Sequence, residues 1–224
     1  IRDFLVRWGV DQPVSTAELH YALGRDLLER YPESRDYSVV AAAAACGVPL
    51  YTSSPGDSSI GMNVAYHELM NGSRLMIDPN KDVNEICAFI LAGTKNGCVI
   101  LGGGSPKNFY LQGQPTLWEV YGIPKGGNDY FIQITTDQVV WGGLSGATPA
   151  EAVSWGKVNP GVLPDTAVAY VDSTLGFPLF CEYVVGSPRN RRPRKELVHK
   201  RDELVATLRK QAKASVESKA EPKT

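Results

Sequence analysis

A lysine at the end of residues 145–157 has a chemical setting that could make it a nucleophile. Lys157 directly follows Trp155 and Gly156, and the acid Glu151 stands earlier in the same stretch. A lysine is a poor nucleophile while it is protonated, with an ordinary pKa of about 10.4. An apolar wall such as Trp155 disfavours the ammonium form and makes a neutral amine available for Schiff-base chemistry. The alternative is that Lys157 is an ordinary surface lysine.

The same stretch carries the signals of a short helix that would present these side chains. Thr148 is a favourable N-cap, Pro149 suits the first helical position, and Glu151 stands three residues after the cap, as a capping box requires. Gly156 then ends the helix and leaves Lys157 projecting just beyond it. Glu151 therefore has two interpretations: it is a capping acid alone, or it also accompanies the lysine.

A glycine triplet marks a second candidate site. The apolar run at residues 98–101 is typical of a strand in a parallel sheet, and three glycines follow it at 102–104. Ser105 is then predicted to cap a helix that Pro106 opens. Glycines at a strand end let the backbone approach a ligand closely, and a helix N-terminus favours anionic groups. The GxGxxG fingerprint is not present here, so the motif alone does not predict a standard Rossmann dinucleotide site.

Two aspartates stand where α/β folds place their ligands. Asp57 lies in a polar loop between a predicted short buried strand at 48–52 and a predicted helix at 58–70. It could accept hydrogen bonds from ribose hydroxyls, or it could cap that helix, and the residues leave both open. Asp172 ends a predicted strand at 166–171, where a carboxylate is well placed for a sugar hydroxyl.

Helices and strands that would position these residues can be predicted along the rest of the chain. Ser15 is predicted to cap a helix at 16–30, and the alanine-rich residues 38–46 predict another. Residues 130–136 alternate as a strand does, and residues 175–185 form an apolar helix that a glycine and a proline interrupt.

Four segments together make the chain resemble the deoxyhypusine synthase family. They are SPGDSSIG at residues 54–61, ILGGGSPKN at 100–108, SGATPAEAVSWGK at 145–157 and VAYVDSTLGFPL at 168–179. The third segment matches, nearly residue for residue, the family segment that holds the catalytic lysine. The resemblance runs from about Ser15 to Val185 and is too specific to arise by chance.

The resemblance implies an α/β fold with a Rossmann-like, mostly parallel sheet flanked by helices. It also implies an NAD-dependent reaction in which spermidine loses 1,3-diaminopropane and an aminobutyl group passes through a lysine imine to an acceptor amine. By resemblance, Lys157 is the catalytic lysine, Trp155 the wall of the polyamine slot and Glu151 an anchor for a substrate ammonium. The residues that would line NAD are Asp57, Gly102, Gly103, Thr136, Gly142, Ser145 and Asp172.

Three positions that the resemblance assigns to the substrate-binding slot depart from the eukaryotic pattern of the family. Met62 and Leu144 stand where that pattern has aspartates, and Asn108 stands where it has a histidine. The two lost acids would have held cationic ends of spermidine, and a buried ammonium without a counter-charge is strongly disfavoured. The pattern resembles the bacterial deoxyhypusine synthase-like or homospermidine synthase-like branch. A small acceptor such as putrescine, which would give homospermidine, is therefore slightly favoured over a protein lysine.

Two other functions remain open. The lost acids would suit a non-catalytic regulatory subunit that oligomerises with an active paralogue, although the presence of Lys157, Glu151 and Trp155 opposes this. Met62 and Leu144 make the slot more apolar, which would suit NAD-dependent chemistry on an amine other than a polyamine.

The resemblance also predicts partners. The resemblance implies a tetramer in which two subunits share each active site, so we expect a homo- or hetero-oligomer. The family has roughly another half-domain before the position of Ser15, with further NAD contacts. We expect that part to be a separate chain or a removed segment, and we expect this chain to need it in order to bind NAD.

Composition adds further limits. The chain has 224 residues, of which 43% are hydrophobic and 21% charged, as in an ordinary soluble globular protein. No apolar run approaches the ~20 residues of a membrane span, and the first residues do not read as a signal peptide, so we expect a cytoplasmic protein. The four cysteines lie apart in apolar contexts, which is typical of buried thiols in a reducing compartment. The three histidines are not clustered, so no metal site is expected.

Charge separates the end of the chain from the rest. Residues 188–224 carry 12 Lys+Arg and 5 Asp+Glu, a net of +7, whereas the remainder carries −8. A basic segment could contact an acidic partner or nucleic acid, but we expect a solvated helix and no nucleic-acid partner. We predict a domain at 1–187, a basic linker and amphipathic helix at 188–213, and a disordered tail at 214–224.

Overall fold

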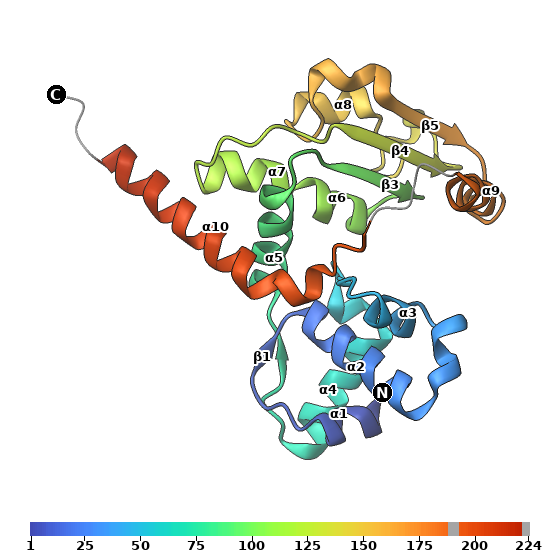
Figure 1. Ribbon diagram of the computed structural model, residues 1–224, viewed down its shortest axis with the longest axis vertical. Helices are drawn as coiled ribbons and strands as arrows, with labels where there is room; N and C mark the ends of the chain where they lie inside the picture. Colours follow the sequence, from blue (N-terminus) through green and yellow to red (C-terminus); the bar gives the residue numbers. More distant parts are fainter. Residues whose placement is uncertain (188–192, 221–224) are drawn as a thin grey trace. The chain divides into compact units, whose positions relative to one another are not determined.

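Two units with separate cores make up the chain in a computed structural model that describes residues 1–187 and 193–220 (Figure 1). Unit 1 comprises Ile1–Glu85 and Arg194–Val205, and unit 2 comprises Ile86–Pro193 and Ala206–Thr224. This division differs from the boundary at residue 187 expected from the sequence, and the expected three-part organisation stays a prediction. Residues 188–192 of the expected linker and 221–224 of the expected tail lie outside the described residues.

Unit 1 is mainly helical and has one small parallel sheet. Strand β1 pairs with β2 in parallel, with Pro13 opposite Met76. Its elements are α1 (Arg2–Trp8), β1 (Pro13–Val14), α2 (Thr16–Arg30), η1 (Pro32–Asp36), α3 (Val39–Ala45), η2 (Pro55–Asp57), α4 (Ser59–Asn71), β2 (Met76–Ile77) and the first half of α5 (Pro79–Ala92). The first residues of α10 (Leu197–Ala220) also belong to this unit.

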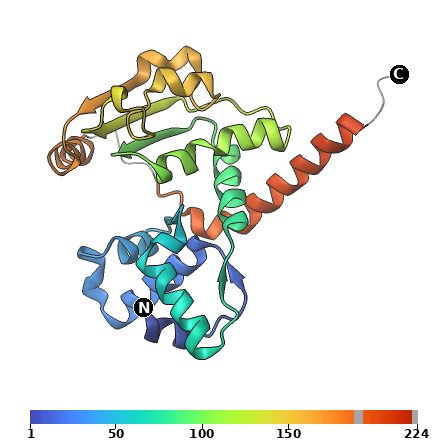
Figure 2. The ribbon, with the colours of Figure 1, turned by 180° about the vertical axis from the view of Figure 1, so that it is seen from behind.

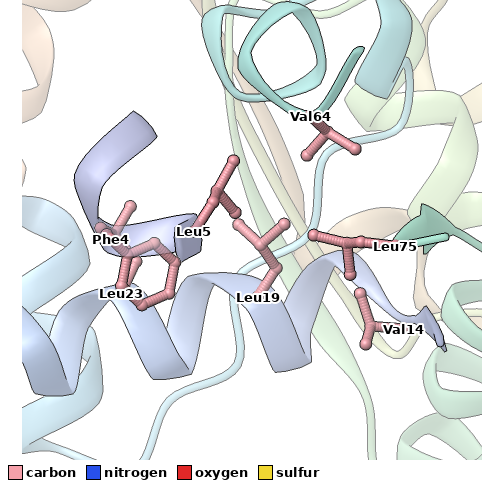
Figure 3. Packing of buried hydrophobic residues seen from close by; sticks show 7 residues of the cluster. All are labelled: Phe4, Leu5, Val14, Leu19, Leu23, Val64 and Leu75. Atoms are coloured by element: carbon pink, nitrogen blue, oxygen red, sulfur yellow. The ribbon is translucent and has the colours of Figure 1, made fainter. Parts of the chain in front are cut away.

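The core of unit 1 is a cluster of buried aliphatic and aromatic side chains between α1, α2, α4 and the segments around the two strands (Figure 3). Leu19 of α2 lies in the middle of this cluster and is fully buried. The other members are Phe4, Leu5, Val14, Leu23, Val64 and Leu75. Burying each such side chain stabilises the unit by about 1.5–3 kcal/mol relative to leaving it in water.

Helix α2 begins where the predicted cap at Ser15 places it. Ser15 forms a full capping box with Glu18, because the Ser15 side chain accepts from the Glu18 amide and the Glu18 carboxylate accepts from the Ser15 amide. Ser38 caps α3 and Ser58 caps α4 through their hydroxyl groups alone, which accept from the amides of Ala41 and Gly61. Ser58, and not Asp57, is therefore the cap of α4, and the capping alternative for Asp57 is wrong.

The predicted strand at 48–52 is wrong. This segment has an irregular backbone, and its polar groups are satisfied from helices instead of from a neighbouring strand. The Val48 amide donates to Ala43 O, His20 Nδ1 donates to Leu50 O, and the Thr52 amide donates to the Thr16 hydroxyl. These helix-derived partners replace the ladder that a strand would require.

Unit 2 is an α/β arrangement with a three-stranded sheet. The strand order is β3–β4–β5, all parallel, with Ile100 of β3 opposite Gln133 of β4 and Gln133 opposite Val168 of β5. Its elements are β3 (Gly97–Leu101), α6 (Ser105–Leu111), α7 (Gly113–Pro115), η3 (Thr116–Val120), β4 (Tyr130–Thr135), η4 (Val139–Trp141), α8 (Pro149–Ser154), η5 (Pro160–Asp165), β5 (Thr166–Tyr170) and α9 (Ser173–Gly186), with the second halves of α5 and α10.

The core of unit 2 joins the sheet to two helices. Ile100 of β3 and Phe131 of β4 pack with Leu111 of α6, Ala152 of α8 and Val158. Helix α9 lies beside the β5 end of the sheet, as both ribbon views show (Figures 1 and 2). The predicted fold class, α/β with parallel sheets flanked by helices, is confirmed, and its Rossmann-like character is consistent with these parallel strands.

The last helix is longer than the sequence suggested. Helix α10 runs over Leu197–Ala220, whereas we expected a helix that ends near Lys213 and a disordered tail from Ala214. Residues 214–220 contain alanine, glutamate and lysine and no glycine or proline, so nothing in them stops a helix. Pro222 is the first residue that could do so.

Three further findings concern membrane spans, metal sites and the cysteines. Among the described residues, no helix has the length and apolar character needed to cross a membrane. Within the same residues, no group of three or more His, Cys, Asp or Glu side chains is arranged to hold a metal ion. All four cysteines are free thiols, but only Cys87 is buried and the other three are half-buried, which corrects the expectation that all are buried.

Candidate active site

A pocket of about 330 Å³ in unit 2 brings together most of the predicted substrate residues. Helices α6 and α8 and the loop between β4 and α8 supply its walls. It is lined by Lys107, Asn108, Leu111, Gln112, Leu144, Ala147, Glu151, Ala152, Trp155 and Lys157. Five of the six residues predicted to bind substrate or carry the chemistry are in this set, and Met62 is not.

The backbone of Lys157 is fixed at both of its polar groups. Gly156 has a left-handed φ of 67°, which turns the chain out of α8, and the Lys157 amide donates back to Ala152 O. The Lys157 carbonyl accepts from both the amide and the side-chain Nδ2 of Asn128, each at 3.0 Å. The buried Asn128 thereby holds the turn that presents the lysine side chain.

The amine of Lys157 meets one polar partner and one aromatic ring. Its Nζ donates to Asn108 Oδ1 at 2.8 Å and lies 5.6 Å from the centre of the Trp155 ring. Burial lowers the pKa of Lys157, and the carboxylate of Glu151 opposes this effect by favouring the ammonium. Trp155 lines the pocket but is still 63% exposed, so it shields the amine from water on one side only.

Glu151 uses its backbone for capping and keeps its carboxylate available. The Thr148 hydroxyl accepts from the Glu151 amide at 3.2 Å, as predicted for the cap of α8. The reciprocal bond from the Thr148 amide to the Glu151 carboxylate, which a full capping box has, is not formed between these two described residues. Among the described residues lining the pocket, Glu151 is the only acid. Its exposed carboxylate can therefore attract a cationic ligand.

Two residues that sequence reasoning missed hold the pocket loop in place. Lys107 and Gln133 are 7% and 1% exposed, and Lys107 Nζ donates to Gln133 Oε1 at 3.1 Å. Lys107 Nζ also donates to the carbonyls of Leu144 at 3.0 Å and Ala147 at 2.7 Å, so all three of its N–H groups are used. Only the position of Lys107 inside the ILGGGSPKN segment could have drawn attention to it.

Gln133 joins the same loop to the glycine triplet. Its Nε2 donates to Gly102 O at 2.8 Å and to Ser145 O at 2.7 Å. A Cβ on Gly103 would lie 2.4 Å from the Cα of Ser145, so the two loops approach closely only because Gly103 has no side chain. The glycine loop and the pocket loop are therefore one packed assembly.

The residues predicted to bind NAD gather largely at one edge of the sheet. Gly102, Thr136 and Asp172 follow the ends of β3, β4 and β5, and neighbouring parallel strands end at a common edge. Gly102 and Gly104 have positive φ values of 71° and 87°, with open space where a Cβ would stand. Half-buried glycine backbone with open space for a ligand, beside polar groups at this edge, fits a dinucleotide.

The local settings of the individual predicted residues differ. Asp172 caps α9 by accepting from the amide and hydroxyl of Thr174, and these bonds lower the pKa of Asp172. Gly142 ends η4 with a φ of 68° and open space around it. Asp57 and the 64% exposed Met62 belong to unit 1 and are not among the residues lining the pocket. The roles of all these residues stay predictions.

The parallel sheet, the glycine loop and the lysine-bearing pocket define the class as an α/β protein with a candidate Schiff-base lysine. The family model of deoxyhypusine synthase matches residues 2–184. A deoxyhypusine synthase-like protein of Nostoc punctiforme is 48% identical over 216 residues, covering 94% of this chain and 55% of the relative. One of the same name from Thermosynechococcus vestitus is 50% identical over 204 residues, covering 87% and 50%.

An archaeal relative from Methanosarcina acetivorans, named "Probable deoxyhypusine synthase 2", is 39% identical over 165 residues, covering 74% of this chain and 46% of the relative. The chain therefore belongs to the deoxyhypusine synthase family, as its four segments predicted. It spans about half the length of the curated relatives it matches.

Proposed function

We propose that this protein catalyses NAD-dependent aminobutyl transfer from a spermidine-like donor to an acceptor amine, with Lys157 as the nucleophile. Membership of the family supports aminobutyl transfer in general. The observation that carries the proposal is the amine of Lys157 in a pocket with Asn108, Trp155 and Glu151, the only acid among the described lining residues. A lysine whose pKa is lowered by burial has more of the neutral amine that imine formation requires.

When bound, NAD would accept a hydride from the donor carbon beside the secondary amine and return it after transfer. The Lys157 amine would add to the resulting donor imine, and 1,3-diaminopropane would leave, so that the four-carbon aminobutyl fragment becomes an imine of Lys157. The acceptor amine would then displace Lys157 and regenerate it. Glu151 would hold the free ammonium of the aminobutyl fragment, and the Gly102–Gly104 loop would lie against the cofactor.

The acceptor is proposed to be a small amine, with putrescine giving homospermidine, ahead of a protein lysine giving deoxyhypusine. Leu144 in the pocket lining supports this choice, because an apolar side chain cannot pair with the additional cationic end that an aspartate would hold. The proposal includes an oligomer with shared active sites.

The test is to incubate the protein with NAD and spermidine, then add borohydride and analyse peptides by mass spectrometry. We expect release of 1,3-diaminopropane and a reduced aminobutyl adduct at position 157. Putrescine or a lysine-bearing protein substrate is added before the borohydride in parallel samples. The compound that removes the adduct from position 157 is the acceptor. If 1,3-diaminopropane appears while position 157 carries no adduct, the lysine-imine mechanism is wrong.

A regulatory subunit is the second candidate, and the presence of a single acid among the described lining residues favours it. A subunit of that kind would give activity only when mixed with an active paralogue. Replacing Lys157 with Met separates the two: the mixture retains activity if this chain is regulatory, and loses the contribution of this chain if Lys157 is the nucleophile.

A further inference from the structure

Asn108 is the side chain that directly holds the amine of Lys157. It stands on the first turns of α6, and its Oδ1 accepts from Lys157 Nζ at 2.8 Å across a separation of 49 residues. In the described part of the chain, no other side chain is recorded in a hydrogen bond with this Nζ. This bond occupies one of the two lone pairs of the amide oxygen and ties the amine of Lys157 to α6.

The charged groups around Lys157 act on it in a different way. Glu151 of α8 and Lys107 of α6 are the other charged residues lining the pocket. Lys107 donates its three N–H groups to Gln133 Oε1, Leu144 O and Ala147 O. Glu151 favours the ammonium of Lys157 through its charge, without a recorded hydrogen bond to it. Neither charged residue therefore sets the direction in which the amine points.

We infer that Asn108 is a positioning residue for the Lys157 amine, a role that goes beyond the substrate contact suggested by its sequence position. An amide does not titrate over the accessible pH range, so it can hold the amine in both of its protonation states. It also stabilises the ammonium less than a carboxylate would, because a charged acceptor forms the stronger bond. Asparagine at this position thus orients the amine while leaving its pKa low.

This inference rests on the proposed function, because that function makes Lys157 the reactive amine. Its test, however, needs neither NAD nor a polyamine. The reaction is imine formation between butanal and the protein, trapped by cyanoborohydride, with the adduct at position 157 quantified by mass spectrometry. The rate is measured from pH 6 to 10, and the midpoint of its rise reports the pKa of the Lys157 amine. Labelling of Lys157 without release of 1,3-diaminopropane from spermidine would contradict the proposed function and leave this inference intact.

Asn108→Asp and Asn108→Leu should move that midpoint in opposite directions. The carboxylate of Asn108→Asp stabilises the ammonium, so we expect an upward shift of about one pH unit. Asn108→Leu removes the acceptor with little change in volume, which favours the neutral amine and moves the midpoint downward. Because the amine is then no longer oriented, we also expect its labelling rate on the high-pH plateau to fall about fivefold.

Gln112→Glu is the matched control, since Gln112 lies one turn further along the chain and lines the same pocket. It adds the same charge without the contact, so its shift should be clearly smaller than that of Asn108→Asp. Equal shifts in these two variants, or shifts of the same sign in the Asp and Leu variants at Asn108, would overturn the inference. Should Asn108→Leu fail to fold, as judged by circular dichroism, the comparison between Asn108→Asp and Gln112→Glu decides alone.

Discussion

The two units each contain a cluster of ionisable side chains, and the clusters are built on opposite principles. In unit 1, carboxylates meet cations: Glu18 Oε2 lies 2.7 Å from Lys81 Nζ, and Arg201 lies 3.2 Å from Glu18 and 3.8 Å from Glu85. In unit 2, the two pocket lysines meet neutral oxygens of amides and carbonyls. Within the described part of the chain, no hydrogen bond or ion pair to the nearby Glu151 carboxylate is recorded.

The pKa values reflect this contrast. Burial alone would raise the pKa of Glu18, but the hydrogen bonds from Lys81 and the Ser15 amide and the charge of Arg201 outweigh burial and lower it. In unit 2, burial lowers the pKa of Lys107 and of Lys157, and the charge of Glu151 only partly opposes it. Pairing with cations thus keeps the pKa of a buried carboxyl low, whereas the pocket lysines, bonded to neutral oxygens, keep the lowered pKa that burial gives them.

The largest effect should come from removing the amine itself. Lys157→Met keeps much of the side-chain length, and we expect adduct formation with NAD and spermidine to fall at least about a thousandfold, as losses of a nucleophile do. Unfolding in urea should change little, because Lys157 is half-buried and has a neutral partner. Lys200→Met, at an exposed lysine of α10, is the control and should retain full activity. Equal loss in both variants would remove the distinction drawn between the clusters.

Removing a paired charge in unit 1 should instead reduce stability. Arg201→Met leaves Glu18 and Glu85 without their common partner, and breaking a buried pair costs ~3–5 kcal/mol, so about 2–3 kcal/mol is expected for this partly exposed one. Hydrogen exchange of peptides within residues 1–85 measures it. The control is Arg74→Met, which breaks an exposed pair with Asp11 and should leave the exchange unchanged. Similar exchange in both variants would show that the cluster is not structural.

Adding one methyl group at Gly103 should disrupt the packing between the glycine loop and the pocket loop. Gly103→Ala would place a Cβ against the Cα of Ser145, and backbone must shift to accommodate it. We expect a loss of about 1–3 kcal/mol in urea unfolding, together with weaker labelling of Lys157. Gly126→Ala meets nothing within 4 Å and should be neutral or slightly stabilising. Normal labelling in Gly103→Ala would show that the loops do not act together.

The smallest effect concerns the acid of the pocket. Because the Glu151 carboxylate favours the Lys157 ammonium, Glu151→Gln should lower the pKa of Lys157 and move the labelling midpoint to lower pH. Glu151 is exposed, so the shift should be less than about one pH unit and should shrink in high salt. Glu119→Gln, at an exposed acid outside the pocket lining, should cause no shift. An upward shift in Glu151→Gln would contradict the assignment.

Features determined by short stretches of chain could be predicted from the sequence. The caps at Ser15 and Thr148 and the turn at Gly156 depend on residues within a few positions, and they lie where expected. The segment holding Lys157 was found for the same reason, since the family resemblance is continuous along it. The strand expected at 48–52 failed because the partners of Leu50 and Thr52 lie in α2, 30 and 36 residues earlier in the chain.

The missed parts of the site are those that arise only in three dimensions. Lys107 reaches Leu144 and Ala147, 37 and 40 residues further along the chain, and Gln133 is an unremarkable polar residue within a strand. Likewise, nothing near Asn108 in the sequence indicates that it faces Lys157. Glu151 was identified, but the capping-box pattern could not tell whether its carboxylate would turn back to the backbone or away from it.

Lys107 and Glu151 make the electrostatic potential differ between two sides of the pocket. The Lys107 ammonium already donates all three of its hydrogens, so it has none left to donate to a ligand. Its positive charge still repels a cation brought near it. We therefore expect a cationic chain that enters the pocket to place its charged end toward Glu151 and its hydrocarbon portion toward Lys107. Lys107 would then orient a ligand to which it donates no hydrogen bond.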